Sequence, residues 1–346
     1  MIRSIRITSK VALVCIFLVV IAGSVVRMTG SGMGCPDWPK CFGYLIPPTD
    51  EATVSWNEQR SFEKGQMIVH NEQLLVAKSS FTTSDTFDGS RWEVYEKHDY
   101  AVFNAAHTWT EYINRLLGAL SGVPVLVLLV LTLFYIRKDW FLFFLSAATT
   151  FMLGFEAWLG KLVVDGNLIP NQITIHMMGA LVIIGLLLAI MARTRKKPVS
   201  RKPVLFPFNS TLLFVLFLSL LQIVLGTQVR EEVDEVSKVF AREDWVENLS
   251  SLFEIHRSFA IAVVLANGIL LWINRRKNYG IVLTNWIMGT IIVEIILGIV
   301  LSYAGMPAWA QPMHLFFAVV MFAFQLYLLL NLLKKPYRKP VIPKHG

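Results

Sequence analysis

Three of the seven histidines in this chain occupy positions suited to binding a metal cofactor. His176, His256 and His314 each lie near the beginning of a long apolar segment. Two imidazoles that face each other across a helix bundle are a common way to hold a haem by two axial ligands. We therefore expect His256 and His314, which belong to the same half of the chain, to be a pair of haem ligands, and His176 to be a third ligand. The simpler interpretation of any one of them is a core histidine that is hydrogen-bonded to a carbonyl.

Two arginines are candidates for binding a haem at its edge. Arg257 directly follows His256, and Arg115 directly follows Asn114, which occupies the matching place in the first half of the chain. Haem propionates are carboxylates, which arginine binds through two parallel hydrogen bonds. Arg115 and Arg257 are therefore candidate propionate partners. Arg27 and Arg230 could serve in the same way, or could extend their charged ends to the membrane surface.

Acidic residues within apolar segments are also functional candidates, because they are expensive to place in lipid. Glu111 lies three residues before Asn114, so the two share a helix face. A carboxylate beside a redox centre could move protons or stabilise a developing cation, whereas an acid near a helix N-terminus could simply interact with the helix dipole. Glu156 and Glu294 could form a proton route or hydrogen-bond between helices.

Two cysteines, Cys35 and Cys41, have five residues between them in a segment expected outside the membrane. A disulfide can persist outside the bacterial cytoplasm, and here it could be structural or redox-labile. A zinc site is not favoured, because there is no second cysteine pair.

The elements that must position these residues are membrane-spanning helices. The chain of 346 residues is 55% hydrophobic and only 16% charged, whereas soluble domains are about 25% charged. A helix needs about 20 apolar residues to cross the hydrocarbon core, and its backbone must be satisfied internally. Eight segments qualify: 9–28, 112–136, 139–160, 173–193, 208–229, 254–274, 281–303 and 313–333. The fold class is therefore an all-α integral membrane protein with eight transmembrane helices.

The net charge of +8 has a topological explanation. Of the 32 lysines and arginines, 19 lie in the N-terminal segment, in the links after the second, fourth and sixth helices, and in the C-terminal tail. The positive-inside rule then places both termini in the cytoplasm. Nucleic-acid binding is not expected, and a bacterial plasma membrane is the simplest location.

The chain contains an internal repeat. The glycines of the third and seventh helices are 138 residues apart, as are the histidines of the fourth and eighth. The matching residues are Gly23, Arg27, Asn114, Glu156, Gly160 and His176 in the first half, and Gly226, Arg230, His256, Glu294, Gly298 and His314 in the second. We expect two duplicated four-helix bundles, 1–198 and 199–346. Since segment 9–28 takes part in the repeat, it is read as a helix rather than as a cleaved signal peptide.

The halves differ in a large external loop at about 29–110 in the first half. A partly alternating run near 66–76 indicates that this loop has some short structure of its own.

Together these residues resemble haem A synthase, a membrane enzyme of cytochrome oxidase assembly. The strongest match is residues 27–43, Arg-Met-Thr-Gly-Ser-Gly-Met-Gly-Cys-Pro-Asp-Trp-Pro-Lys-Cys-Phe-Gly, which is a long and specific motif at the end of the first helix. The resemblance implies oxidation of the C8 methyl of haem O to the formyl group of haem A through a hydroxymethyl intermediate. It implies a haem b cofactor bound by His256 and His314, a substrate haem bound by His176, and assistance of the methyl oxidation by Glu111.

One departure from the family concerns the substrate side. The family usually has Glu-x-x-His-Arg at the start of the second helix, but this chain has Asn114 in place of the histidine. Asparagine is a poor iron ligand compared with imidazole. We expect His176 to be the sole protein ligand of the substrate iron; the alternative is that His107, seven residues before Asn114, replaces the missing ligand.

Two other functions compete with the enzyme. A haem b electron carrier would explain His256 and His314 but not Glu111, His176 or the Cys35–Cys41 motif. A transporter or haem-handling chaperone would explain the repeat, since transporters often contain one. The expected partners are haem O and membrane lipid. The resemblance adds haem O synthase and oxidase assembly factors.

Overall fold

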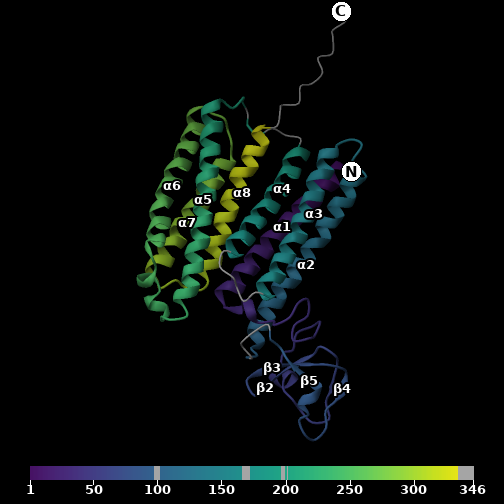
Figure 1. Cartoon of the computed structure of the whole chain (residues 1–346). Helices are drawn as coiled ribbons and strands as arrows, with labels where there is room; N and C mark the ends of the chain where they lie inside the picture. Colours follow the sequence, from purple (N-terminus) through teal and green to yellow (C-terminus); the bar gives the residue numbers. More distant parts are fainter. Residues whose placement is uncertain (97–101, 166–171, 196–198, 201, 334–346) are drawn as a thin grey trace, which may run out of the picture.

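The computed structural model describes residues 1–96, 102–165, 172–195, 199–200 and 202–333. Within these residues, eight helices are long and apolar enough to cross a membrane. They lie roughly side by side, and a small strand-containing insertion extends from one end of them (Figure 1). We call this the insertion end. The eight helices are α1 Ile2–Met28, α2 Ala105–Leu133, α3 Trp140–Asp165, α4 Gln172–Thr194, α5 Phe206–Val236, α6 Ser251–Arg276, α7 Leu283–Tyr303 and α8 Ala310–Leu333.

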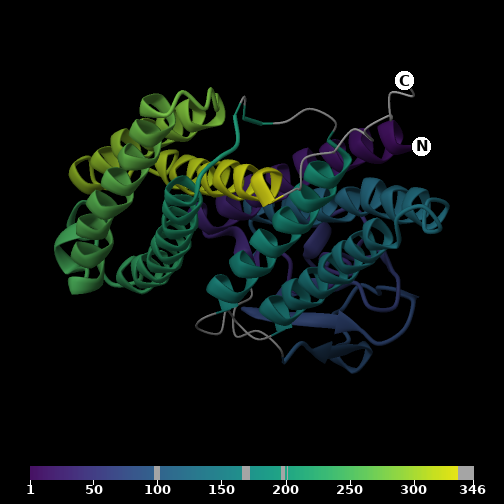
Figure 2. The same ribbon diagram turned by 90° about the horizontal axis from the view of Figure 1, so that it is seen from above.

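The helices pack in two groups of four. In the first group α1 contacts α2 and α4, and α3 contacts α2 and α4; in the second α5 contacts α6 and α8, and α7 contacts α6 and α8. Figure 2, turned by 90° from the view of Figure 1, shows the two groups beside each other. Helices α4 and α8 form much of the junction, since α8 contacts α1 and α4, and α4 also contacts α5.

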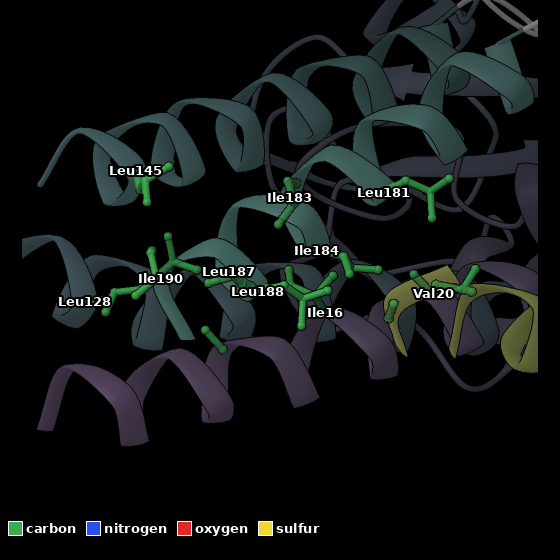
Figure 3. Packing of buried hydrophobic residues seen from close by; sticks show 14 of the residues in the cluster. Ile16, Val20, Leu128, Leu145, Leu181, Ile183, Ile184, Leu187, Leu188 and Ile190 are labelled. Carbon is green, nitrogen blue, oxygen red and sulfur yellow. The ribbon is translucent and has the colours of Figure 1, made fainter. Parts of the chain in front are cut away.

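Apolar stripes explain how α1 packs against its neighbours. Its buried residues Ile5, Ala12, Ile16 and Val20 follow one another at intervals of seven, four and four residues, which places them on one side of the helix. They meet residues from α2, α3, α4 and α8 in one core (Figure 3). In lipid, close packing rather than water exclusion holds such helices together, so the fit of these side chains positions the helices.

One polar contact fixes α6 against α8. The side-chain amide of Gln325 donates through Nε2 to Oδ1 of Asn267 at 3.1 Å, and both side chains are buried. Asn267 lies eleven residues after His256 on α6, and Gln325 lies eleven residues after His314 on α8. A buried interhelical hydrogen bond sets the relative position of two helices, so this pair aligns the two that carry the candidate ligands.

The insertion contains short strands, as the alternating run near 66–76 predicts. Strands β2 (Met67–His70) and β3 (Gln73–Ala77) form an antiparallel hairpin. Its two turn residues, Asn71 and Glu72, both have positive φ, which matches the twist of a tight hairpin. Strand β5 (Trp92–Val94) pairs with β3, and β1 (Ser61–Phe62) pairs with β4 (Phe81–Thr82).

Several helices begin or end beyond the predicted apolar segments. Helix α2 begins at Ala105 rather than near 112, because the Asn104 side chain accepts the His107 backbone N–H at 3.1 Å and caps the helix. The external loop therefore ends earlier than predicted. Helix α1 begins at Ile2, and α5 continues to Val236.

The basic links after α2 and α6 lie at the end of the helices away from the insertion (Figure 1). Some predicted cytoplasmic charges and the predicted boundary between the halves lie outside the described residues, which exclude 196–198, 201 and 334–346.

Candidate functional site

His256 on α6 and His314 on α8 face each other. Their ring centroids are 6.4 Å apart, and the ring planes are nearly perpendicular, at 83°. A metal–imidazole bond is about 2.0–2.1 Å long, which puts the ring centres of two imidazoles on opposite sides of one iron at roughly 6.3 Å. The two side chains therefore fit the axial ligation of a haem iron.

Close neighbours hold each of these histidines. A Cβ atom on Gly226 of α5 would lie 3.1 Å from Cε1 of His256, so only glycine leaves the ring its present place. Nδ1 of His314 lies 2.9 Å from Oε2 of Glu294 on α7. A carboxylate at Nδ1 orients an imidazole and leaves Nε2 to bind a metal.

The first group of helices has a similar arrangement. Nδ1 of His176 on α4 contacts Oε2 of Glu156 on α3. Gly179 provides space for this carboxylate, since a Cβ atom there would overlap it. Glu156 and Glu294 thus each contact a histidine of the next helix, and this contact is compatible with both roles considered for them from the sequence.

The position on α2 that matches His256 differs in residue type. Asn114 on α2 lies beside Gly23 of α1, where a Cβ atom would be 3.8 Å from Oδ1 of Asn114. His256 has the same relation to Gly226, so Asn114 stands where the other half has an imidazole. The Oδ1 atom of Asn114 is buried without a hydrogen-bond partner among the described residues.

His107 lies in the first turn of α2, where its main-chain carbonyl packs closely against Gly34. Seven residues separate it from Asn114, which is about 10 Å along a helix. The two side chains are therefore on a similar face but at different levels.

Glu111 is held by the segment that contains Cys35 and Cys41. This carboxylate is only 4% exposed. It accepts the backbone N–H of Cys35 at 2.8 Å and contacts the Arg115 guanidinium. Because Glu111 lies beyond the first turn of α2, and the helix dipole acts mainly within that turn, interaction with the dipole does not explain its position.

Arg115 connects the same segment to α2. It donates to the main-chain carbonyls of Asp37 at 2.7 Å and Lys40 at 3.0 Å. Cys35 and Cys41 form a disulfide. We call this arrangement, Cys35–Cys41 with Glu111 and Arg115, the cysteine-loop clamp.

Asp37 is a residue of the clamp that the sequence analysis did not single out. Its Oδ2 accepts the Gly43 backbone N–H at 2.9 Å, while Oδ1 is buried without a partner among the described residues. Burial raises the pKa of this carboxyl, although the Gly43 N–H and the Arg115 charge act in the opposite direction. Its place in the motif of residues 27–43 was the available signal.

The remaining arginines are placed differently from one another. Arg27 and Arg230 both contact the Asp234 carboxylate, the latter at 2.7 Å. Sequence analysis missed Asp234, although its position four residues after Arg230 could have suggested a helical ion pair. Arg257 is exposed, and its guanidinium carbon lies 5.7 Å from the ring centre of Phe253.

Residues 6–326 match the COX15-CtaA family, described as cytochrome oxidase assembly protein. The chain therefore belongs to the COX15-CtaA family of haem A synthases, a family of oxidoreductases.

Two relatives carry the name Heme A synthase. The protein from Shewanella oneidensis is 26% identical over 196 residues, which is 54% of this chain and 45% of that protein. The chain thus aligns with less than half the length of this relative. The protein from Flavobacterium psychrophilum is 22% identical over 346 residues, which covers 91% of this chain and 94% of that protein.

Proposed function

We propose that this chain is a haem A synthase that oxidises the C8 methyl of haem O to a formyl group through a hydroxymethyl intermediate. The observation that carries this proposal is the buried carboxylate of Glu111, one turn from Asn114 on α2, in a helix group that also holds the His176–Glu156 pair. A simple electron carrier needs neither the clamp around Glu111 nor the second histidine–carboxylate pair.

In this proposal the two helix groups are duplicated halves with different tasks. His256 and His314 hold haem b in the second half, 199–346, and haem b supplies electron transfer there. The first half, 1–198, binds haem O through His176. Arg257 and Arg115 are the candidate propionate partners, and Arg115 would have to be shared with the carbonyls of the cysteine-loop clamp.

The substrate iron has one protein ligand in this proposal. Asn114 offers an amide rather than an imidazole, and His107 lies about two helical turns away from that level. Both considerations favour His176 alone, with the opposite side of the substrate iron open or weakly held.

Glu111 is the proposed catalytic residue. Its carboxylate contacts the Cys35 N–H and the Arg115 guanidinium. These two groups hold it in one orientation, and it is buried from solvent. Each oxidation step removes two electrons from the methyl-derived carbon. A fixed carboxylate can stabilise positive charge that develops on this carbon, or accept the proton released.

We place the protein in the bacterial plasma membrane with both termini in the cytoplasm. The basic links lie at the end of the helices away from the insertion (Figure 1), which supports this orientation by the positive-inside rule. The insertion and the cysteine-loop clamp are then outside the cytoplasm. Haem O synthase and oxidase assembly factors are the partners expected for such an enzyme.

The test is haem extraction and mass analysis from bacterial membranes that make haem O, with and without this protein. We expect haem A or the hydroxymethyl intermediate only with the protein, and loss of both with Glu111→Gln. Glu72→Gln, a change at an exposed residue of the insertion, is the matched control and should keep the activity. Unchanged haem O together with bound haem b would instead support the electron carrier.

A further inference from the structure

Helix α5 extends further past Gly226 than α1 extends past Gly23, although these two glycines occupy matching positions in the repeat. Helix α1 ends at Met28, five residues after Gly23, whereas α5 continues for ten residues after Gly226, to Val236. This extension belongs to the second helix group but lies at the junction with the first.

One face of the extension touches the first group. Thr227, Glu231 and Asp234 have four- and three-residue spacing, which aligns them along one side of a helix. Thr227 Oγ1 lies 2.9 Å from Oγ1 of Thr174, which also donates to Oε1 of Glu231 at 3.4 Å. Thr174 is two residues from His176 on α4, so the extension contacts the helix turn that carries the candidate substrate ligand.

Asp234 makes the second connection between the groups. Its Oδ2 contacts Arg27 of α1, and its Oδ1 lies 2.7 Å from Arg230 of α5. Arg230 also donates to the main-chain carbonyl of Arg27 at 3.1 Å. The three side chains are between 21% and 25% exposed, so two cations share one carboxylate in a mostly buried cluster.

This cluster lies close to both candidate haem sites. Arg27 is one helical turn from Gly23, which packs beside Asn114, and Arg230 is one turn from Gly226, which packs against His256. Without a negative charge between them, the two guanidiniums would repel each other and separate the ends of α1 and α5.

We propose that Asp234 is a positioning residue that couples the two haem sites, by holding Arg27 of the substrate half and Arg230 of the cofactor half in one cluster. The inference rests on the proposed function. It assigns to the α5 extension the task of keeping the electron-transferring cofactor and the substrate in a constant relative position, and of setting the charge near haem b.

The first test is a redox titration of haem b in the purified full-length protein. Asp234→Asn removes one negative charge beside two arginines, which favours the reduced haem, so we expect a higher midpoint potential with normal haem b content. Asp234→Glu should restore the potential of the original protein. Glu235→Gln is the control, because Glu235 is 73% exposed and pairs with Lys238, and it should leave the potential unchanged.

The outcomes separate the two proposals. A protein that binds no haem b would refute the proposed function. Normal haem b content with an unchanged potential in Asp234→Asn would overturn the coupling role, and so would lowered haem b content without a shift, since a merely structural residue would behave in that way.

A second test needs no haem. The thermal unfolding of Arg27→Gln, Asp234→Asn and the double variant can be compared in haem-free protein. If the carboxylate and guanidinium interact across the two helix groups, the double variant will be destabilised by less than the two single effects together. Additive effects would contradict the contact.

Discussion

The close packing of Gly226 against His256 makes Gly226→Ala a specific test of the proposed haem b site. The new Cβ atom would lie 3.1 Å from Cε1 of His256 and 3.8 Å from Nδ1. Ordinary carbon–carbon contacts are about 3.5–4.0 Å, so the ring must move by several tenths of an ångström. The ring lies 6.4 Å from that of His314, and any movement changes this separation.

The expected magnitude follows from two opposing effects. Alanine is about 1 kcal/mol more favourable than glycine within a helix, while overpacking in a well-packed interior costs about 1–3 kcal/mol. The net change in the stability of the protein should therefore be small. If the imidazole absorbs the overpacking cost, the affinity for haem b should fall by about 5- to 150-fold.

Gly23→Ala is the matched control. Its Cβ atom would lie 3.8 Å from Oδ1 of Asn114, an ordinary contact distance, so haem b binding should not change. The assay is the haem b content and visible spectrum of the two purified variants after exposure to a haem-scavenging protein. Equal retention of haem b with an unchanged low-spin spectrum in both would refute the reasoning.

Three further predictions concern single carboxylates and amides of the two sites. Glu294→Gln removes the carboxyl group that contacts Nδ1 of His314, and such losses typically lower metal affinity by about 10- to 100-fold; the rate of haem b dissociation should rise, and an unchanged rate would contradict the prediction. Asn114→His supplies the imidazole that the family usually has and this chain lacks, so added haem O should become low-spin; a spectrum identical to that of the original protein would argue against a site for the substrate iron there. Burial raises the pKa of Asp37, so the folded state binds more protons than the unfolded state and stability should decline as the pH rises through the raised pKa. Asp37→Asn should weaken this decline in the thermal midpoint, and an equal decline in both proteins would show that another group causes it.

Much of the helical architecture could be predicted from the sequence because lipid imposes a strong constraint. A backbone that cannot bond to water must be helical in the hydrocarbon region, so eight long apolar segments predict eight helices. The positions of the helix ends were predicted less accurately than the number of helices. The Asn104 cap extends α2, and polar residues such as Glu231 and Asp234 continue α5 beyond its apolar segment, because helices outside lipid are not limited to apolar residues.

The candidate site was predicted in its residue types but not in its contacts. Spacing identified His176, His314, Glu156 and Glu294, yet it could not decide whether the glutamates pair with the histidines, because that depends on how α3 packs on α4 and α7 on α8. The same limitation applies to Arg115, whose guanidinium reaches carbonyls more than seventy residues earlier in the chain. Contacts between distant segments follow from packing, which a single sequence does not reveal.

The differences between the two helix groups carry the functional argument further than their similarities do. Both groups contain a histidine–glutamate pair, and both place a glycine beside the residue on the facing helix. In the proposed function an imidazole at that position, as in His256, would complete two axial ligands and suit a haem that only exchanges electrons. An amide, as in Asn114, would leave one side of the proposed substrate iron weakly held, which suits a haem that must enter, react and leave. The buried Glu111 lies in the group with the amide, so the carboxylate and the weakly ligated position occur together. In the proposed function this asymmetry separates a substrate group from a cofactor group, and a carrier with two equivalent haems would not need it.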